Sequence, residues 1–90
     1  MDYDELRHAL VSKAKADPDN RNHVFYYVTV EGRERRVTKL SHAASGHVDP
    51  DLLSKIARQM WLTNKELRAF VDCELSRDGW LALGRSRGRL

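Results

Sequence analysis

The segment VFYYVTVEGRERRVTKL, residues 24–40, decides the fold. Its first seven residues are all β-branched or aromatic, which is typical of a strand. Gly32 supplies the positive φ of a tight turn, so residues 33–40 predict the returning strand of an antiparallel hairpin. Regular alternation would place Arg35 and Lys39 on one face of that strand. A lone hairpin is marginal in water, so this one must pack on other elements.

Helical patterns flank the hairpin on both sides. Before it, Leu6 and Leu10 lie at helical spacing, and Pro18 ends that helix. The polar residues 17–22 predict a loop between this helix and the hairpin.

Three helix starts follow the hairpin. Asp49 and Pro50 match an N-cap and a first helical residue, and Thr63 with Glu66 has the spacing of a capping box. Residues 76–83 predict a short last helix. The order helix, strand, strand, helix, helix, followed by this short last helix, indicates a small α+β domain with an antiparallel hairpin packed on helices. We expect this single domain to span residues 1–84, followed by a basic flexible tail over residues 85–90.

Composition limits the class of protein. The chain has 90 residues, of which 41% are apolar and 32% charged, so neither a disordered nor a membrane-embedded chain is expected. Cys73 is the only cysteine and excludes an internal disulfide. No apolar run has the length of a signal peptide or a membrane span, so we expect a cytoplasmic protein. The histidines show no zinc-ligand spacing, and we expect neither a metal nor a cofactor.

Basic residues gather on the returning strand. The net charge of the chain is +3, and four cations lie between residues 33 and 39: Arg33, Arg35, Arg36 and Lys39. Such a cluster is either a solvated strand face or a surface for a polyanion. We expect nucleic acid as the partner, with RNA favoured over DNA.

Two histidines lie at matching positions on the arms of the hairpin. His23 lies nine residues before Gly32 and His42 ten residues after it, so both should lie at the same end of the ribbon, beside Arg21 and Lys39. Histidine suits acid–base cleavage of RNA, because its pKa lies near neutrality and a nearby cation can stabilise the phosphate. Ser41 adds a hydroxyl group at this end. Alternatively, these residues only hold loop backbone.

The chain loosely resembles the HicA family of bacterial toxins. The resemblance is carried by His23, Phe25, Gly32, Arg36, Val37, Thr38, His42, Leu53, Ile56, Gln59, Leu62, Glu66 and Phe70. It covers about half of the chain, residues 23–71. It implies a metal-independent endoribonuclease (an mRNA interferase) with a fold like a double-stranded-RNA-binding domain, His23 as catalytic base, a basic strand that grips RNA, and an antitoxin-like protein partner.

Two other interpretations stay open. Residues 53–67 look like a helix-turn-helix DNA reader, in which the second helix would place four side chains in the major groove: Thr63, Asn64, Lys65 and Arg68. The aromatic strand, with Phe25, Tyr26 and Tyr27, could instead pair with a protein partner or with a second copy in a homodimer.

Overall fold

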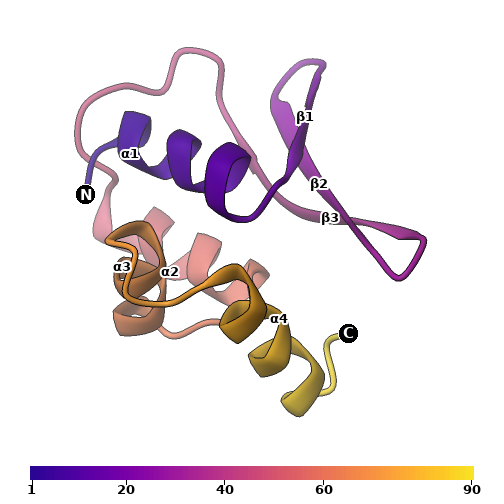
Figure 1. The fold of residues 1–90 in the computed structure, drawn as a ribbon. Coiled ribbons are helices and arrows are strands. Elements are labelled where there is room, and N and C mark those ends of the chain that lie inside the picture. The colour runs from indigo at the N-terminus through magenta and orange to yellow at the C-terminus, as the bar shows by residue number, and fades with distance from the viewer.

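The hairpin forms as the sequence predicts (Figure 1). In the computed structural model, which describes residues 1–90, strand β2 spans Val24–Val30 and strand β3 spans Arg33–Leu40. Between them, Glu31 and Gly32 have φ of 53° and 78°. Two consecutive positive φ angles are typical of the two-residue turn whose twist matches that of the strands. The turn lies far from the N-terminus, on the side of the molecule where the chain ends.

A third strand, β1, spans Asp17–Asn20, where the sequence predicted a loop. It pairs antiparallel with β2, from Asp17 opposite Tyr27 to Asn20 opposite Val24, and the sheet order is β1-β2-β3. The loop prediction was wrong because it relied on the low strand propensity of Asp, Asn and Pro. An edge strand tolerates these residues, since one of its sides faces solvent and a proline there needs no partner.

A β-bulge interrupts the pairing of β2 with β3. Thr38 lies opposite Tyr26 and Arg36 opposite Tyr27, so Val37 between them is an extra residue without a partner. Residues before Val37 therefore lie on the opposite face from the one that regular alternation with residues 38–40 would give them. The prediction that Arg35 and Lys39 share one face is therefore wrong. Two basic side chains, Lys39 opposite Phe25 and Arg36 opposite Tyr27, lie on the outer face of the sheet with those aromatic rings. The other two, Arg35 opposite Val28 and Arg33 opposite Val30, lie on the inner face.

The first helix ends irregularly. Helix α1 (Tyr3–His8) continues into a π-helical turn, η1 (Ala9–Lys13). Lys15 then leaves the helix with a φ of 58°, and the chain enters β1 two residues later.

Three helices follow the sheet: α2 (Pro50–Gln59), α3 (Asn64–Val71) and α4 (Arg77–Ser86). Asp49 caps α2 by accepting a hydrogen bond from the backbone N–H of Asp51. Thr63 and Glu66 form the predicted capping box of α3. These caps satisfy N–H groups that the helix itself leaves free, each worth about 1 kcal/mol.

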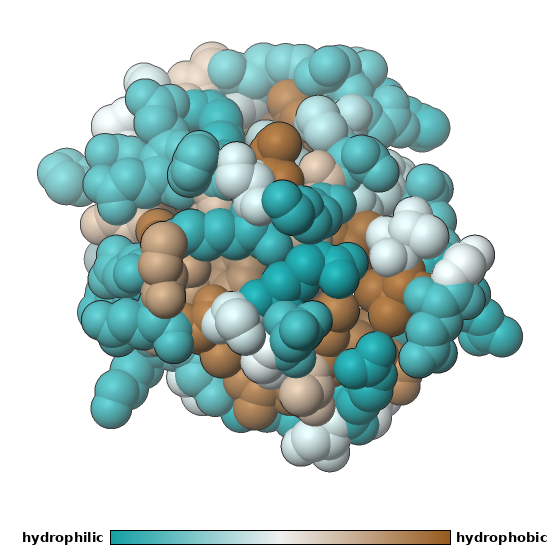
Figure 2. All heavy atoms as spheres, viewed as in Figure 1, coloured by the Kyte–Doolittle hydropathy of each residue, from teal (hydrophilic) through white to brown (hydrophobic).

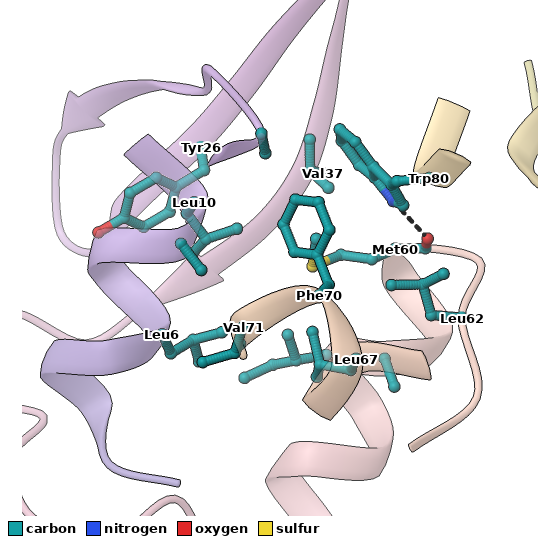
Figure 3. Packing of buried hydrophobic residues seen from close by; sticks show 14 of the residues in the cluster. Leu6, Leu10, Tyr26, Val37, Met60, Leu62, Leu67, Phe70, Val71 and Trp80 are labelled. Atoms are coloured by element: carbon teal, nitrogen blue, oxygen red, sulfur yellow. Dashed lines mark hydrogen bonds between the residues drawn. The ribbon is translucent and has the colours of Figure 1, made fainter. Parts of the chain in front are cut away.

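One hydrophobic core joins the helices to the inner face of the sheet (Figure 3). It contains 21 buried apolar residues. Leu6 and Leu10 reach it from the first helix, Tyr26 from β2, Phe70 from α3 and Trp80 from α4. Burial of each such side chain contributes about 1.5–3 kcal/mol, so this α+β architecture depends on contacts between all of its elements.

Trp61 turns the chain between α2 and α3 with a φ of 54°. Its indole stacks on that of Trp80, with ring centroids 4.9 Å apart and planes 7° from parallel. Its Nε1–H donates to the Trp80 carbonyl at 2.9 Å, while Trp80 Nε1–H donates to the Met60 carbonyl at 3.0 Å. The stacked pair therefore fixes α4 against the α2–α3 turn.

Helix α4 is longer than predicted and includes Arg85 and Ser86. Beyond it, both terminal nitrogens of Arg87 donate to the Glu66 carboxylate at 2.8 Å, and one of them also donates to the Trp61 carbonyl. The flexibility of residues 85–90 stays a prediction. None of the helices is long and apolar enough to cross a membrane.

Candidate nucleic-acid interface

A pocket of about 210 Å³ lies at the end of the sheet where β2 begins and β3 ends. We call it the His23 pocket. Its polar lining consists of Tyr3, His23, Lys39, Ser41, Lys55 and Gln59. It therefore gathers one imidazole and two ammonium groups around a single hollow, without any carboxylate.

Strand pairing and two helices, α1 with Tyr3 and α2, build this pocket. Val24 lies opposite Leu40, so the next residue outward on each strand lies at the mouth of the same hollow. From the other side, α2 contributes Lys55 and Gln59, which are four residues apart and share one face of the helix. Thr38 Oγ1 donates to Gln59 Oε1 at 2.6 Å and fixes α2 against β3.

The two predicted histidines lie at the same end of the ribbon but in different surroundings. His42 Nε2–H donates to the Arg21 carbonyl at 2.7 Å, while the Arg21 backbone N–H donates to the His23 carbonyl at 3.0 Å. His42 thus holds loop backbone. The exposed His23 ring makes no hydrogen bond with the protein and lines the pocket. Of the two, His23 is the imidazole with neither ring nitrogen bonded to the protein.

Two further predicted residues at this end already have partners. The Arg21 guanidinium pairs with the Asp19 carboxylate, Nε to Oδ2 at 3.0 Å, at the exposed edge of the sheet. Ser41 Oγ accepts from the Ala43 backbone N–H at 3.3 Å, which is the loop-holding role that the sequence left open.

On the outer face of the sheet, an aromatic ring lies between two cations. The Arg36 guanidinium carbon lies 5.5 Å from the centre of the Phe25 ring, and Lys39 Nζ lies 6.0 Å from it. Neither cation forms an ion pair with the protein, because the four ion pairs of the chain involve other residues. Lys39 also lines the His23 pocket, so the two features are continuous.

The remaining two predicted cations, Arg33 and Arg35, lie elsewhere. They line a second hollow, with Arg85 of α4, on the inner side of the ribbon near its turn. The bulge at Val37 places Lys39 on the opposite face from them, beside Arg36, so the four basic residues divide between the two faces of the ribbon.

Sequence reasoning missed Tyr3, Lys55 and Gln59. All three lie on helices, and their place beside residues 23 and 39 depends on how α1 and α2 pack on the sheet. The four-residue spacing of Lys55 and Gln59 shows that they share a helix face, but no local pattern says that this face meets the end of β3.

Of the four residues predicted to read DNA, three lie at the start of α3 and Arg68 lies in its last turn, and two of the four have structural partners. Thr63 Oγ1 accepts from the backbone of Glu66, and Asn64 Nδ2 donates to Ser54 Oγ at 2.9 Å. Lys65 and Arg68 are exposed. Bidentate hydrogen bonds from Arg87 and a backbone bond from Thr63 lower the pKa of Glu66 to about 2, so this helix start is a tightly bonded structural unit.

No group of three or more His, Cys, Asp or Glu side chains is placed to hold a metal ion. No protein-family model, no curated protein and no solved structure matches the chain. Inferences about function therefore depend on the arrangement of its own residues.

Proposed function

We propose that the chain binds RNA, with bases on the outer face of β2 and β3 and the sugar–phosphate backbone at the His23 pocket. One observation carries this proposal: a free imidazole shares a pocket with two ammonium groups, and one of those cations also flanks an aromatic ring on the adjoining sheet face. Cations that have no acidic partner within the protein are available to bind phosphates, and an aromatic ring beside them offers a stacking surface to a nucleobase.

RNA is favoured because bases can leave a single strand and stack on exposed rings, whereas those of a duplex are hidden. Phe25 and Tyr27 are half-buried on the outer face, and Arg36 lies beside both of them. The similarity to HicA toxins also points to RNA, and an antitoxin-like partner remains part of that proposal.

The structure offers less support for the rival functions. A helix-turn-helix reader needs free side chains at the start of its second helix, but Thr63 and Asn64 already make hydrogen bonds there. The prediction that the aromatic strand pairs with a partner is wrong, because β2 is the central strand and both of its edges are already paired, with β1 and with β3. A strand-pairing partner would have to use a free edge. The edge of β1 carries Asp17 and Pro18, and that of β3 exposes Arg33, Arg35 and Lys39; charges and proline at an edge oppose strand addition. Figure 2 shows a face on which hydrophilic residues surround smaller apolar areas, and Val11, at 44%, is the one exposed large apolar side chain.

A matched pair of double variants tests binding. R36A/K39A and K65A/R68A each remove one arginine and one lysine from exposed positions, so they change the net charge equally. With a labelled single-stranded RNA at low salt, fluorescence anisotropy should show R36A/K39A weakened about tenfold or more and K65A/R68A within about twofold of wild type. The opposite ranking, with stronger binding to duplex DNA, would establish the helix-turn-helix function instead.

A second candidate function, RNA cleavage, is favoured by the free ring of His23. In the proposed step, a His23 ring nitrogen removes the proton of a ribose 2′-hydroxyl, and the 2′-oxygen attacks the adjacent phosphorus. The P–O5′ bond breaks, and the leaving 5′-oxygen takes a proton from solvent. Lys39 and Lys55 stabilise the negative charge that develops on the phosphate oxygens. The products are a 2′,3′-cyclic phosphate and a 5′-hydroxyl end.

Cleavage is tested by incubating RNA with protein in the presence of EDTA. His23→Ala should lower the rate about 10²–10⁴-fold, as expected for loss of a general base. His8→Ala, which removes an exposed imidazole on the opposite side of α1 from the core, should leave the rate unchanged. Equal rates for wild type and His23→Ala would remove cleavage from the proposal without affecting RNA binding.

A further inference from the structure

A second basic hollow lies near the turn of the β2–β3 hairpin, and we call it the arginine cleft. It has a volume of about 360 Å³. Its lining consists of Val30, Glu31, Arg33, Arg35, Arg85 and Leu90. The cleft therefore combines three guanidinium groups from two distant parts of the chain, the returning strand and the last helix.

The bulge in β3 is what brings two of these arginines into the cleft. Beyond Val37 the alternation is reset, so Arg35 lies opposite Val28 and Arg33 opposite Val30, on the inner side of the ribbon. They are two residues apart, which separates their Cα atoms by about 6–7 Å along one strand. Two guanidinium groups at this spacing can reach one phosphate or two adjacent phosphates.

The charges within the cleft are not balanced by the protein. Glu31 is the only acidic side chain in its lining, and this carboxylate lies 3.6 Å from Arg85 Nη2 while keeping 79% of its side chain exposed. Arg33 and Arg35 form no ion pair and no side-chain hydrogen bond. Cations gathered in a hollow repel one another, and an anion that enters would relieve this repulsion. Guanidinium groups match the oxygens of a phosphate in bidentate geometry.

We propose that the arginine cleft is a phosphate-binding site, and that it holds the backbone of the same RNA strand whose bases lie on the outer face. The choice of RNA as the source of the phosphate rests on the proposed function. A third hollow is lined by Arg36 and Lys39 of the outer face and by Arg89, whose neighbour Leu90 lines the cleft. Basic side chains thus continue from the outer face toward the cleft, over about 20 Å of strand from Lys39 to Arg33.

Inorganic pyrophosphate tests the cleft without RNA. In spectra of the ¹⁵N-labelled arginine side chains, pyrophosphate should shift the Nε–H signals of Arg33, Arg35 and Arg85 saturably. The shift of Arg85 should persist in R36A/K39A and disappear in R33A/R35A. Glu31→Gln removes the only acidic side chain of the cleft and should tighten pyrophosphate binding severalfold. Scattered, non-saturating shifts, or saturation that survives R33A/R35A, would overturn the proposal.

Single-stranded RNA tests the source of the phosphate. R33A/R35A should weaken binding about tenfold and lower the slope of log Kd against log salt by about 1.4, since each single-strand phosphate contact contributes about 0.7. R33K/R35K keeps the charge and should keep the slope, with part of the affinity lost. Unchanged melting temperatures would show that the variants stay folded, because both side chains are exposed.

The pyrophosphate and RNA experiments together distinguish a failure of the phosphate site from a failure of the proposed function. If the protein binds pyrophosphate at the cleft but does not bind RNA, the proposed function is refuted. The cleft would then be a phosphate site for a free phosphate-bearing ligand. RNA binding with an unchanged Kd and slope in R33A/R35A would refute the cleft and leave the proposed function standing. An acidic peptide that occupies the cleft where pyrophosphate does not would also refute it, in favour of a protein partner.

Discussion

Replacing Gly84 by alanine should destabilise the protein, although alanine is the better helix former. A Cβ atom on residue 84 would lie 2.7 Å from two atoms of the Trp61 indole and 2.9 Å from a methyl carbon of Leu90. Trp61 cannot move freely, because it is stacked on Trp80 and bonded to its carbonyl. Overpacking costs about 1–3 kcal/mol, and loss of the indole hydrogen bond about 1 kcal/mol. Helix propensity offsets about 1 kcal/mol of this, which leaves a loss of about 2 kcal/mol.

Gly79→Ala is the matched control, since residue 79 lies on the same helix. Its Cβ atom would lie 2.9 Å from the end of the Leu75 side chain, which is flexible and can move aside. We expect this variant to stay within about 1 kcal/mol of wild type. In thermal unfolding, Gly84→Ala should lower Tm by about 10 °C, from about 4–8 °C per kcal/mol for a chain of this size. An unchanged or higher Tm for Gly84→Ala would refute the packing of α4 on Trp61, and with it the position of Arg85 at the arginine cleft.

Three further perturbations test the structure. The pKa of Glu66 is lowered from 4.5 to about 2, so its contribution is present above pH 4.5 and is lost as the pH falls toward 2. In urea unfolding at pH 7, the free energy of unfolding of wild type should therefore exceed that of Glu66→Gln by about 1 kcal/mol, a value reduced by solvent screening of the partly exposed Arg87. This difference should disappear near pH 2. A difference that does not change with pH would contradict the ion pair. Thr38→Val removes the hydrogen bond to Gln59 and should cost about 1 kcal/mol by the same assay, and an equal stability would show that this bond does not fix α2. Asp49→Ala removes the cap of α2 and should cost about 1 kcal/mol, with Asp49→Asn close to wild type as its control.

Local sequence patterns predicted the hairpin, its turn and the helix starts, because each depends on residues close together in the chain. Residues 24–30 are strongly β-forming, and Gly32 supplies the turn. β1 was not predicted, because its four residues have little strand propensity and are extended by pairing with β2. The bulge at Val37 was also invisible, since its sequence alternates as regularly as an unbulged strand would.

The candidate site was predictable only in part, for the same reason. Hairpin geometry correctly placed residues 23 and 42 at one end of the ribbon, because strand pairing follows from the position of the turn. It could not show that His42 bonds to loop backbone while His23 stays free. The contribution of Lys55 and the separation of Arg33 from Lys39 depend on helix packing and on one inserted residue, neither of which has a local signal.

The most direct test of RNA binding at the His23 pocket and the outer sheet face is to map where RNA contacts the protein. A short single-stranded RNA is titrated into ¹⁵N-labelled protein, and the backbone amide shifts are followed residue by residue. We expect the largest amide shift changes at residues 23–27 and 36–41, with smaller ones at Lys55 and Gln59. Changes confined to residues 63–68, or no saturable change at micromolar protein and low salt, would contradict this expectation.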